Sequence, residues 1–395
     1  MKRNILSFAA KIGPVIGKLI PKKVKDHIKH SFSYANYRSE QLRWEVENTL
    51  GWPLPEESDY RSPCELCLGI FKDNSYLYAY NIAACRDLKV GYKVLDMFSP
   101  SWMEDILNSE YDAFLATPPT LLDQWHRLFE ERLWVIVYEL KKRVYPTFEE
   151  LYLWESKRRM IYWMMAHRIP HPRSWIFLDY DEAVSFCDAI QYPIVLKLNK
   201  GASSNGVFIL QSRKQARQLV KKLFSVGVVP RSSDKRNKEW GTAIFQEYIP
   251  HNREWRIVRI GGSYLCRVKR VVGEFASGSG LVEWAKPLPG MLDFVRNITE
   301  SSGFRCMSLD IFENPFNDER GPFLVNELQT IVGFREIPET EDTGRWVFDQ
   351  ETKQWRFEPG VYHQNLLANL RVRDLLSLLI TKRKAVKSEN SVFNQ

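Results

Sequence analysis

The 395-residue sequence predicts a mixed α/β protein with two successive sheet regions. In the first, at about residues 62–147, short apolar stretches alternate with helical stretches, which is typical of a small parallel α/β layer. In the second, from residue 157 to about 334, apolar stretches follow one another through short turns, which predicts antiparallel strands. A chain of this length exceeds the usual size of one hydrophobic core, so two or three compact units are expected.

The composition indicates a soluble protein of a reducing compartment. The chain has 44% hydrophobic residues and a mean hydropathy of -0.35, which is enough apolar material for a sizeable core. No apolar run approaches the roughly 20 residues of a membrane-spanning helix, so none is expected. Six cysteines in so long a chain do not make a disulfide framework, which favours a cytoplasmic location.

The positive charge is concentrated at the N-terminus. Residues 1–38 hold 9 basic residues and one acid, whereas the rest of the chain holds 47 of each sign. Apolar residues at helical spacing between the lysines predict a basic amphipathic extension over residues 1–55. It either lies on an anionic membrane at the inner face or packs on the body or on a partner. The neutral body argues against a nucleic-acid binder, which spreads basic residues over one surface.

The first region is predicted to be a small domain that precedes a larger one. Its predicted strands are CELCLGIF, YKVLDMF and YDAFLATP, with helical stretches around residues 76–88 and 101–108 between them. The lone C-x-x-C motif runs straight into an apolar stretch, so buried strand thiols are favoured over zinc ligands. We place the domains as an N-terminal extension over 1–55, an α/β domain over 56–150, a second domain over 151–375 and a C-terminal tail over 376–395.

The stretch PIVLKLNKGASSNGVFIL predicts a β-hairpin in which one strand ends at Lys197 and a turn of small residues leads into the next. Gly201 and Gly206 permit backbone angles that β-branched residues disfavour. Successive N–H groups in such a turn form an anion site, and the hydroxyls of Ser203 and Ser204 add donors. The turn lacks the order of a Walker motif and leads to a strand, so it is not a P-loop.

Oxygen-bearing side chains end two later strands. The stretch RCMSLDIFENP places Asp310 at the end of one strand, and GPFLVNELQTIVG places Glu327 and Gln329 at the end of another. Residues 327 and 329 share a face by the period-two rule, so the three side chains can share a hard cation through oxygen ligands. Lysines, a glycine-rich turn and a carboxylate cluster together indicate a site for a magnesium nucleotide.

With these motifs in this order, the chain resembles the ATP-grasp superfamily, in particular its RimK-like and D-alanine ligases, over about residues 155–333. The resemblance implies an ATP-grasp fold behind a small parallel α/β domain, with ATP and Mg²⁺ or Mn²⁺ in a cleft between two subdomains. It assigns the phosphates to Lys157 and Lys197, the flap over them to Ser203, Ser204 and Gly206, the adenine hinge to Glu247, Tyr248 and Ile249, the ribose to Glu254, and the metal to Asp310, Glu327 and Gln329.

Two positions depart from the family's pattern. Gln329 stands where asparagine is commonest, and Ser308 stands where the D-alanine ligases carry an arginine. The positive charge for the reacting acyl group is therefore expected from Arg267 or Arg270, with Arg256 in support. Arg267 and Arg270 cannot share a face of one strand, because their spacing is odd.

The resemblance implies carboxylate activation by ATP and capture of the acyl phosphate by an amine, which makes an amide. Suitable substrates are small molecules, peptides or glycans that carry a carboxylate or an amine, and surface-polysaccharide modification is one context, by analogy only. Two alternatives stay open: an ATP-grasp kinase, or a non-catalytic nucleotide-binding or anion-binding module whose basic tail contacts membrane or nucleic acid. The aromatic segment of residues 344–365 either walls the acceptor side or forms a hairpin on the core.

Overall fold

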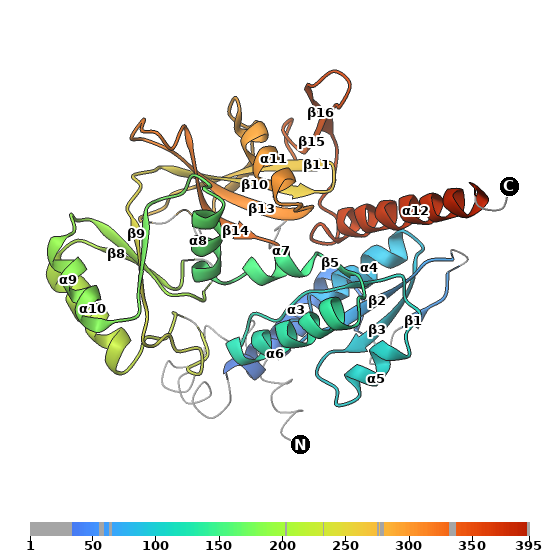
Figure 1. Cartoon of the computed structure of the whole chain (residues 1–395), viewed down its shortest axis with the longest axis horizontal. Coiled ribbons are helices and arrows are strands. Elements are labelled where there is room, and N and C mark those ends of the chain that lie inside the picture. Colours follow the sequence, from blue (N-terminus) through green and yellow to red (C-terminus); the bar gives the residue numbers. More distant parts are fainter. Residues whose placement is uncertain are drawn as a thin grey trace.

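The computed structural model describes most of the chain, but not the greater part of the predicted N-terminal extension. Described are residues 34–54, 59–62, 65–201, 204–231, 233–274, 276, 280–331 and 337–392, with only the backbone of 384–392. Residues 1–33 and Ser203 of the predicted flap lie outside this set. Figure 1 shows the first domain beside a large central sheet, with a smaller lobe on the far side of that sheet.

The first domain contains the predicted parallel layer. Its sheet has the order β1-β3-β2-β4-β5, and all neighbouring strands are parallel except β1 and β3. Neighbouring residues of β2, such as Ile70 and Phe71, face two different hydrophobic cores, so both faces of the sheet are covered. The strands are β1 (Asp59–Tyr60), β2 (Cys67–Lys72), β3 (Gly91–Asp96), β4 (Ala113–Leu115) and β5 (Val144–Tyr145), and the helices are α4 (Tyr78–Asp87), α5 (Trp102–Leu107), α6 (Asp123–Trp134) and the π-helical turn η1 (Val135–Glu139).

The smaller lobe is a four-stranded antiparallel sheet of order β6-β9-β7-β8. Ala183 and Val220 of its two helices pack with Leu196 and Phe245 of the sheet in one core, so one face is covered and the other is left for a ligand. The elements are β6 (Ser174–Phe177), α9 (Tyr180–Ala189), β7 (Ile194–Lys197), β8 (Val207–Leu210), α10 (Arg213–Ser225) and β9 (Ala243–Glu247).

The central sheet is antiparallel, with the order β14-β13-β10-β11-β15-β16, and β12 also pairs with β11. Its aromatic hairpin, β15 and β16, packs on the sheet, with the ring of Trp355 4.9 Å from that of Tyr264. The elements are α7 (Phe148–Leu153), α8 (Lys157–Ala166), β10 (Arg253–Ile260), β11 (Ser263–Arg270), β12 (Val282–Trp284), α11 (Met291–Ser301), β13 (Cys306–Glu313), β14 (Phe323–Gln329), β15 (Gly344–Phe348) and β16 (Trp355–Pro359).

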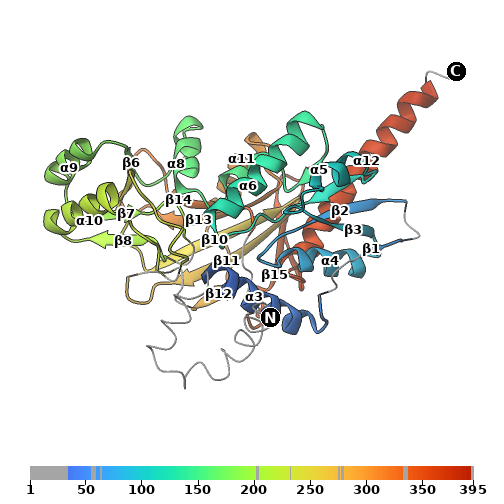
Figure 2. The same ribbon diagram turned by 90° about the horizontal axis from the view of Figure 1, so that it is seen from below.

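Two helices toward the ends of the described chain pack on the body, and one of them crosses a predicted domain limit. The last helix, α12 (Ala368–Val392), runs through residue 376, where a separate tail was expected to begin. Leu375 and Leu379 of α12 are buried in the core that α4 also lines, so this helix belongs to the fold. The first described helix, α3 (Tyr34–Leu50), lies beside α4 (Figure 2). Apolar contacts on one face anchor each helix, which is why neither is an independent tail.

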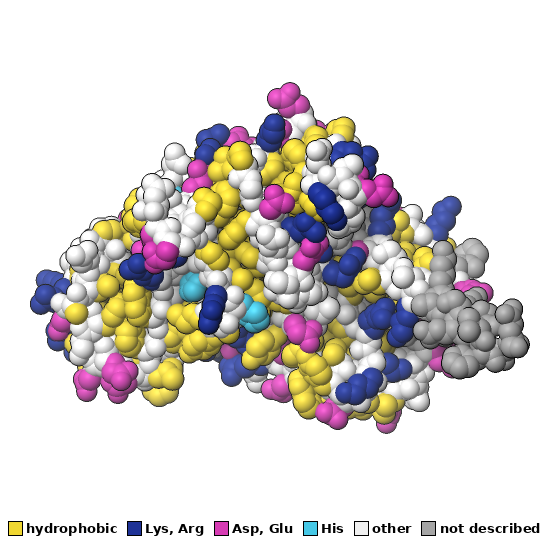
Figure 3. All heavy atoms as spheres, turned by 45° about the horizontal axis from the view of Figure 1, so that its top comes forward, with side chains coloured by type: hydrophobic (Ala, Val, Ile, Leu, Met, Phe, Trp, Pro, Cys, Tyr) yellow, Lys and Arg dark blue, Asp and Glu magenta, His cyan; other side chains and the backbone are white. Residues whose placement is uncertain are grey.

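The described helices include none that is long and apolar enough to cross a membrane. On the face seen in Figure 3, basic and acidic side chains are interspersed, in keeping with the neutral charge balance predicted for the body.

Candidate nucleotide-binding site

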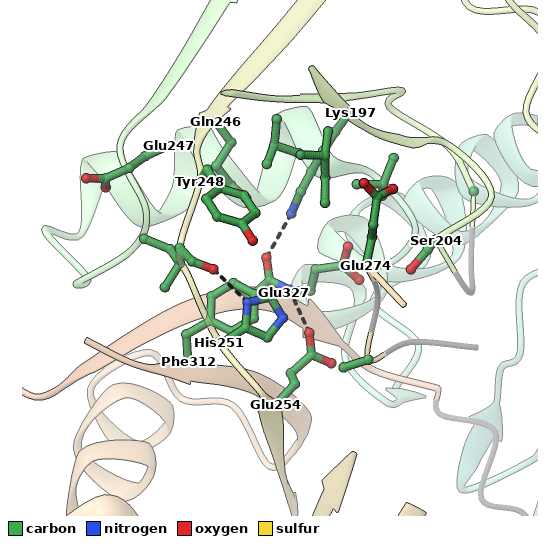
Figure 4. Close-up of a pocket in the computed structure, with 17 residues that line it drawn as sticks. Lys197, Ser204, Gln246, Glu247, Tyr248, His251, Glu254, Glu274, Phe312 and Glu327 are labelled. Atoms are coloured by element: carbon green, nitrogen blue, oxygen red, sulfur yellow. Dashed lines mark hydrogen bonds between the residues drawn. The ribbon is translucent and has the colours of Figure 1, made fainter. Parts of the chain in front are cut away.

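A cavity lies between the open face of the smaller lobe and the central sheet. Figure 4 shows Lys197 entering it from one side and Glu254 from the other, with Glu327 between them. Apolar side chains of both walls line the same cavity, which suits a flat aromatic base next to charged groups. The lining residues are Val195, Lys197, Gly201, Ser204, Val207, Ile209, Gln246, Glu247, Tyr248, Ile249, His251, Glu254, Glu274, Ala276, Phe312, Asn326 and Glu327.

Of the two predicted phosphate lysines, Lys197 lines this cavity and Lys157 contacts two residues that line it, Gly201 and Glu327. Lys197 ends β7 and is only 6% exposed, and its Nζ donates to Oδ1 of Asn326 at 2.8 Å. Lys157 begins α8, and its Nζ donates to the carbonyl oxygen of Gly201 at 2.8 Å and lies 3.8 Å from Oε1 of Glu327. Burial lowers the pKa of Lys197 to about 8. The ammonium group of Lys157 therefore lies at the turn that was predicted to bind an anion, whereas that of Lys197 reaches across the cavity to β14.

The turn between β7 and β8 has the predicted hairpin form. Its two glycines, however, are favoured for different physical reasons. The positive φ angles belong to Gly201, at 130°, and to Ser204, at 59°. Gly206 was expected to need such an angle and does not have one. Instead, a Cβ atom there would lie 3.0 Å from the carbonyl oxygen of Lys200 and 3.1 Å from Cβ of Leu198. Glycine is required at 206 by the close approach of two chain segments.

The predicted adenine hinge connects the smaller lobe to the central sheet. Tyr248 and Ile249 line the cavity, and Ile249 packs with Phe312. The carboxylate of Glu247 points away from the cavity (Figure 4). It accepts hydrogen bonds from Arg320, at 2.5 Å, and from the backbone N–H of Arg173, at 3.1 Å. The side chain of Glu247 therefore ties the predicted hinge to Arg320 and Arg173 and does not enter the cavity.

The acids predicted to bind the metal and the ribose project from one face of the central sheet. The strand register places Arg267, Arg256, Asp310 and Glu327 opposite one another on successive strands. The two oxygens of Asp310 accept from Nε and Nη2 of Arg256 at 2.6 and 2.7 Å. Burial opposes ionisation, but Lys157 and Lys197 hold the pKa of Glu327 below its usual value. The side-chain amide of Gln329 donates a hydrogen bond to Oε2 of Glu327 at 3.0 Å, so the two predicted metal ligands lie side by side.

The three predicted arginines lie in different environments. Arg256 is buried against Asp310, which raises its pKa further although burial alone would lower it. The guanidinium of Arg267 lies 4.5 Å from the ring centre of Trp284, and burial lowers its pKa to about 9. Arg270 is exposed and forms a 2.5 Å ion pair with Glu283. Arg267 and Arg256 therefore share the face of the acids, whereas Arg270 does not.

Asn326 and Lys269 are among the polar residues of the site that sequence reasoning missed. Asn326 adjoins Glu327, yet both line the cavity, because the β13–β14 ladder has an irregularity between Asp310 and Ile311 that offers an extra residue on β14. Lys269 contacts Glu254 and Asp310 through its ammonium group. The period-two rule could have found Lys269, two residues after Arg267, whereas nothing in the sequence marks the irregularity at Asn326.

A second cavity continues from the phosphate end of the first. Gly201 lines both cavities, and the second one is walled by α3, the loop before α6 and the turn of the smaller lobe. Thr120 and Glu155 connect it to a further hollow against α12. Glu155 has a φ of 56°, in the region that is sparsely populated for residues other than glycine. At Gly201 the first cavity thus adjoins a second one that extends toward the first domain.

Comparisons with known proteins give one family and several distant structures. Residues 155–283 match the RimK-like ATP-grasp domain. Among the curated proteins, no match was found.

Three of the solved structures that match show how low the sequence identity is. A RimK-domain ATP-grasp protein from Sphaerobacter thermophilus shares 14% identity over 68% of this chain and 92% of its own, with a TM-score of 0.47. A D-alanine–D-alanine ligase from Bacillus anthracis shares 15% over 80% and 99%, with a TM-score of 0.49. An N5-carboxyaminoimidazole ribonucleotide synthetase from Thermotoga maritima shares 15% over 67% and 68%, with a TM-score of 0.45. Over residues 155–283 the chain therefore matches a RimK-like ATP-grasp domain, which agrees with the resemblance that its motifs predicted.

Proposed function

We propose that this protein is an ATP-dependent ligase that activates a carboxylate as an acyl phosphate and joins it to an amine. One observation carries the proposal: Lys157, Lys197 and Glu327 converge where the first cavity adjoins a second one at Gly201. Cations that meet a carboxylate at such a junction suit transfer of the terminal phosphoryl group of ATP to a second substrate.

The cavity offers a place for each part of ATP. The base fits between Val195 and Ile209 of the smaller lobe and Phe312 of the central sheet, with its edge at the hinge backbone. Glu254 lines the same cavity and is placed to accept from the ribose hydroxyls. The triphosphate then extends toward Lys197 and Lys157, whose hydrogen-bond acceptors, an amide and a carbonyl oxygen, are neutral and exchangeable.

The donor set at the end of β14 fits a divalent ion. Glu327 and Gln329 supply a carboxylate and an amide oxygen, which are the ligand types that Mg²⁺ or Mn²⁺ takes together with phosphate oxygens. When bound, the ion neutralises charge on the β- and γ-phosphates. The lysines, for their part, orient the phosphates, and the turn at Ser204 to Gly206 excludes water from them.

On the acceptor side, the arginines and Glu155 have separate roles in this proposal. Arg256 and Arg267 lie on the face of the acids and stabilise negative charge on the acyl phosphate as it forms. Glu155 lines both acceptor hollows and is placed to hold the incoming amine and take its proton. The carboxylate substrate is a small molecule, a peptide or a glycan, with peptide or surface-polysaccharide modification as the context.

A screen for ADP release over amino acids and uronic acids, with mass spectrometry of the products, tests this function. An amide product supports the ligase, a phosphate ester indicates a kinase, and no turnover indicates a binding module. Glu327→Gln is the control for contaminating ATPases, because loss of the carboxylate at the metal should abolish ADP release while leaving the fold intact. ADP release that persists in this variant would remove the assignment of Glu327.

We also propose that the basic segment of residues 1–38 holds the enzyme at the inner face of an anionic membrane. Deletion of residues 1–33 leaves α3 in place and should release the protein from acidic vesicles, and added salt should weaken binding of the intact chain. Vesicle binding that the deletion does not change would contradict this role. A deleted chain that no longer folds would favour packing of the segment on the body.

A further inference from the structure

The acids of the nucleotide site are separated from one another by cations of the chain itself. Asp310 is 1% exposed, and both of its oxygens are occupied. Besides Arg256, Nζ of Lys269 donates to Oδ2 of Asp310 at 2.7 Å. The same ammonium group donates to Oε1 of Glu254. Two cations therefore already neutralise the carboxylate that would be the first metal acid.

Lys269 is the centre of a continuous polar chain across the cavity floor. Oε2 of Glu254 accepts from the amide of Asn326 at 3.0 Å, and that amide's oxygen accepts from Lys197. The chain therefore runs from a phosphate lysine through the ribose acid to Lys269 and Asp310. Within the described residues, no three His, Cys, Asp or Glu side chains gather in a way that could hold a metal. The interposed ammonium group of Lys269 accounts for this at Glu254 and Asp310.

A divalent ion at Asp310 would have to displace at least one of these cations. The ion would then lie beside the displaced charge in a buried place, and like charges repel strongly where water is excluded. Glu327 differs, because Oε2 accepts from the neutral amide of Gln329, and Lys157 lies 3.8 Å from Oε1. A metal can therefore reach Glu327 without breaking a short ion pair.

We infer that Lys269 is a built-in cation that takes the place of a metal ion at Asp310, so that the nucleotide brings one divalent ion into this site, at Glu327 and Gln329. Asp310 is then a positioning residue, which holds Arg256 and Lys269 toward the ribose and the phosphates. The inference rests on the proposed function, because it assumes that a nucleotide occupies the cavity.

Counting bound Mn²⁺ tests this inference without measuring activity. Electron paramagnetic resonance of free Mn²⁺, with a non-hydrolysable ATP analogue at the protein's concentration, should give one bound ion per chain. Asp310→Asn and Glu327→Gln form a matched pair, because each removes one charge at opposed positions of neighbouring strands. We expect Glu327→Gln to weaken Mn²⁺ binding on the order of a hundredfold and Asp310→Asn to change it less than about threefold. Two ions in the unaltered protein, or equal losses in both variants, would overturn the inference.

Replacement of Lys269 by a neutral residue should open the second metal position. Lys269→Met should add a second Mn²⁺ at Glu254 and Asp310, whereas Lys269→Arg should keep one ion. Lys214→Met, on the exposed face of α10, is the control. A folded Lys269→Met variant that still binds one ion contradicts the inference. If this variant does not fold, the count in the unaltered protein and the matched acid pair still decide.

The outcomes separate this inference from the proposed function. One Mn²⁺ per bound nucleotide, with no ADP release for any acceptor, would remove the ligase and leave the role of Lys269. Two Mn²⁺ per nucleotide with normal ADP release would remove the role of Lys269 and leave the ligase. Calorimetry of analogue binding on the same samples shows whether the nucleotide is bound in each case.

Discussion

The two walls of the nucleotide cavity hold their cations in different ways. On the smaller lobe and α8, Lys197 and Lys157 donate to an amide oxygen and a backbone carbonyl. On the central sheet, Arg256 and Lys269 donate to carboxylates in short ion pairs. A neutral oxygen is readily exchanged for a phosphate oxygen, whereas removing one partner from a buried ion pair leaves an uncompensated charge. In the proposed function, the cations of the first wall therefore exchange their partners for phosphate oxygens, whereas those of the second wall keep their ion pairs.

This difference predicts that the largest catalytic loss comes from the exchangeable wall. Lys197→Ala should lower phosphoryl transfer on the order of a hundredfold or more, as for loss of one preorganised charge donor. Adenosine binding should barely change, because the base rests on the hinge and on apolar side chains. Steady-state ADP release and calorimetry with ATP and adenosine measure the two effects. An equal loss of ATP and adenosine affinity would mean that Lys197 supports the fold of the cavity and not the phosphates.

A smaller loss of turnover is expected from a change in the turn between β7 and β8, which adjoins Lys197. Gly206→Val should lower turnover on the order of tenfold, because its side chain would push the turn away from Lys200 and Leu198 and hold it open. Gly262→Val is the matched control, since an added Cβ there meets nothing within 4 Å and its φ is not positive. The melting temperature of both variants separates an open turn from general destabilisation. Similar turnover in the two variants would show that the turn does not close on the phosphates.

The sequence predicted strands and side-chain positions well where residues follow the regular alternation of a strand. It predicted them poorly where a backbone irregularity or a contact distant in sequence sets the direction of a side chain. Strand alternation predicted the sheets. Lys197 and Glu327 were predicted because each lies in the last residues of a strand beside a recognisable motif, and both line the cavity. Asn326 was missed, since its side chain enters the cavity through an irregularity in the ladder. The direction of Glu247 was also invisible in the sequence, because it depends on Arg320, which is 73 residues away. Helix α12 was placed partly in a tail because its partner core is built from the first domain.

Burial of Lys197 adds a dependence on pH that the central sheet does not share. Its pKa of about 8 without ligand should rise when phosphates bind, because they favour the charged form. ATP affinity is therefore complete below this pKa and falls above it, by up to about tenfold per pH unit. At pH 9, binding should take up protons, which calorimetry in buffers of different ionisation enthalpy detects. Lys197→Met should remove the uptake, and an unchanged uptake in that variant would assign it to another group.

The smallest effect is expected for an arginine on the wrong face of the central sheet. Arg270 ends β11 and is paired with Glu283 outside the cavity, whereas Arg267, three residues earlier, shares the face of Arg256 and Asp310. Arg270→Ala should therefore change ADP release less than about twofold, since an exposed ion pair contributes little. Arg267→Ala serves as the comparison and should lower turnover at least about tenfold, with a smaller change in ATP affinity, because its charge matters when the acyl phosphate forms. If Arg270→Ala gave the larger loss, the side chain would have to turn inward on substrate binding, and the fixed character of this wall would no longer hold.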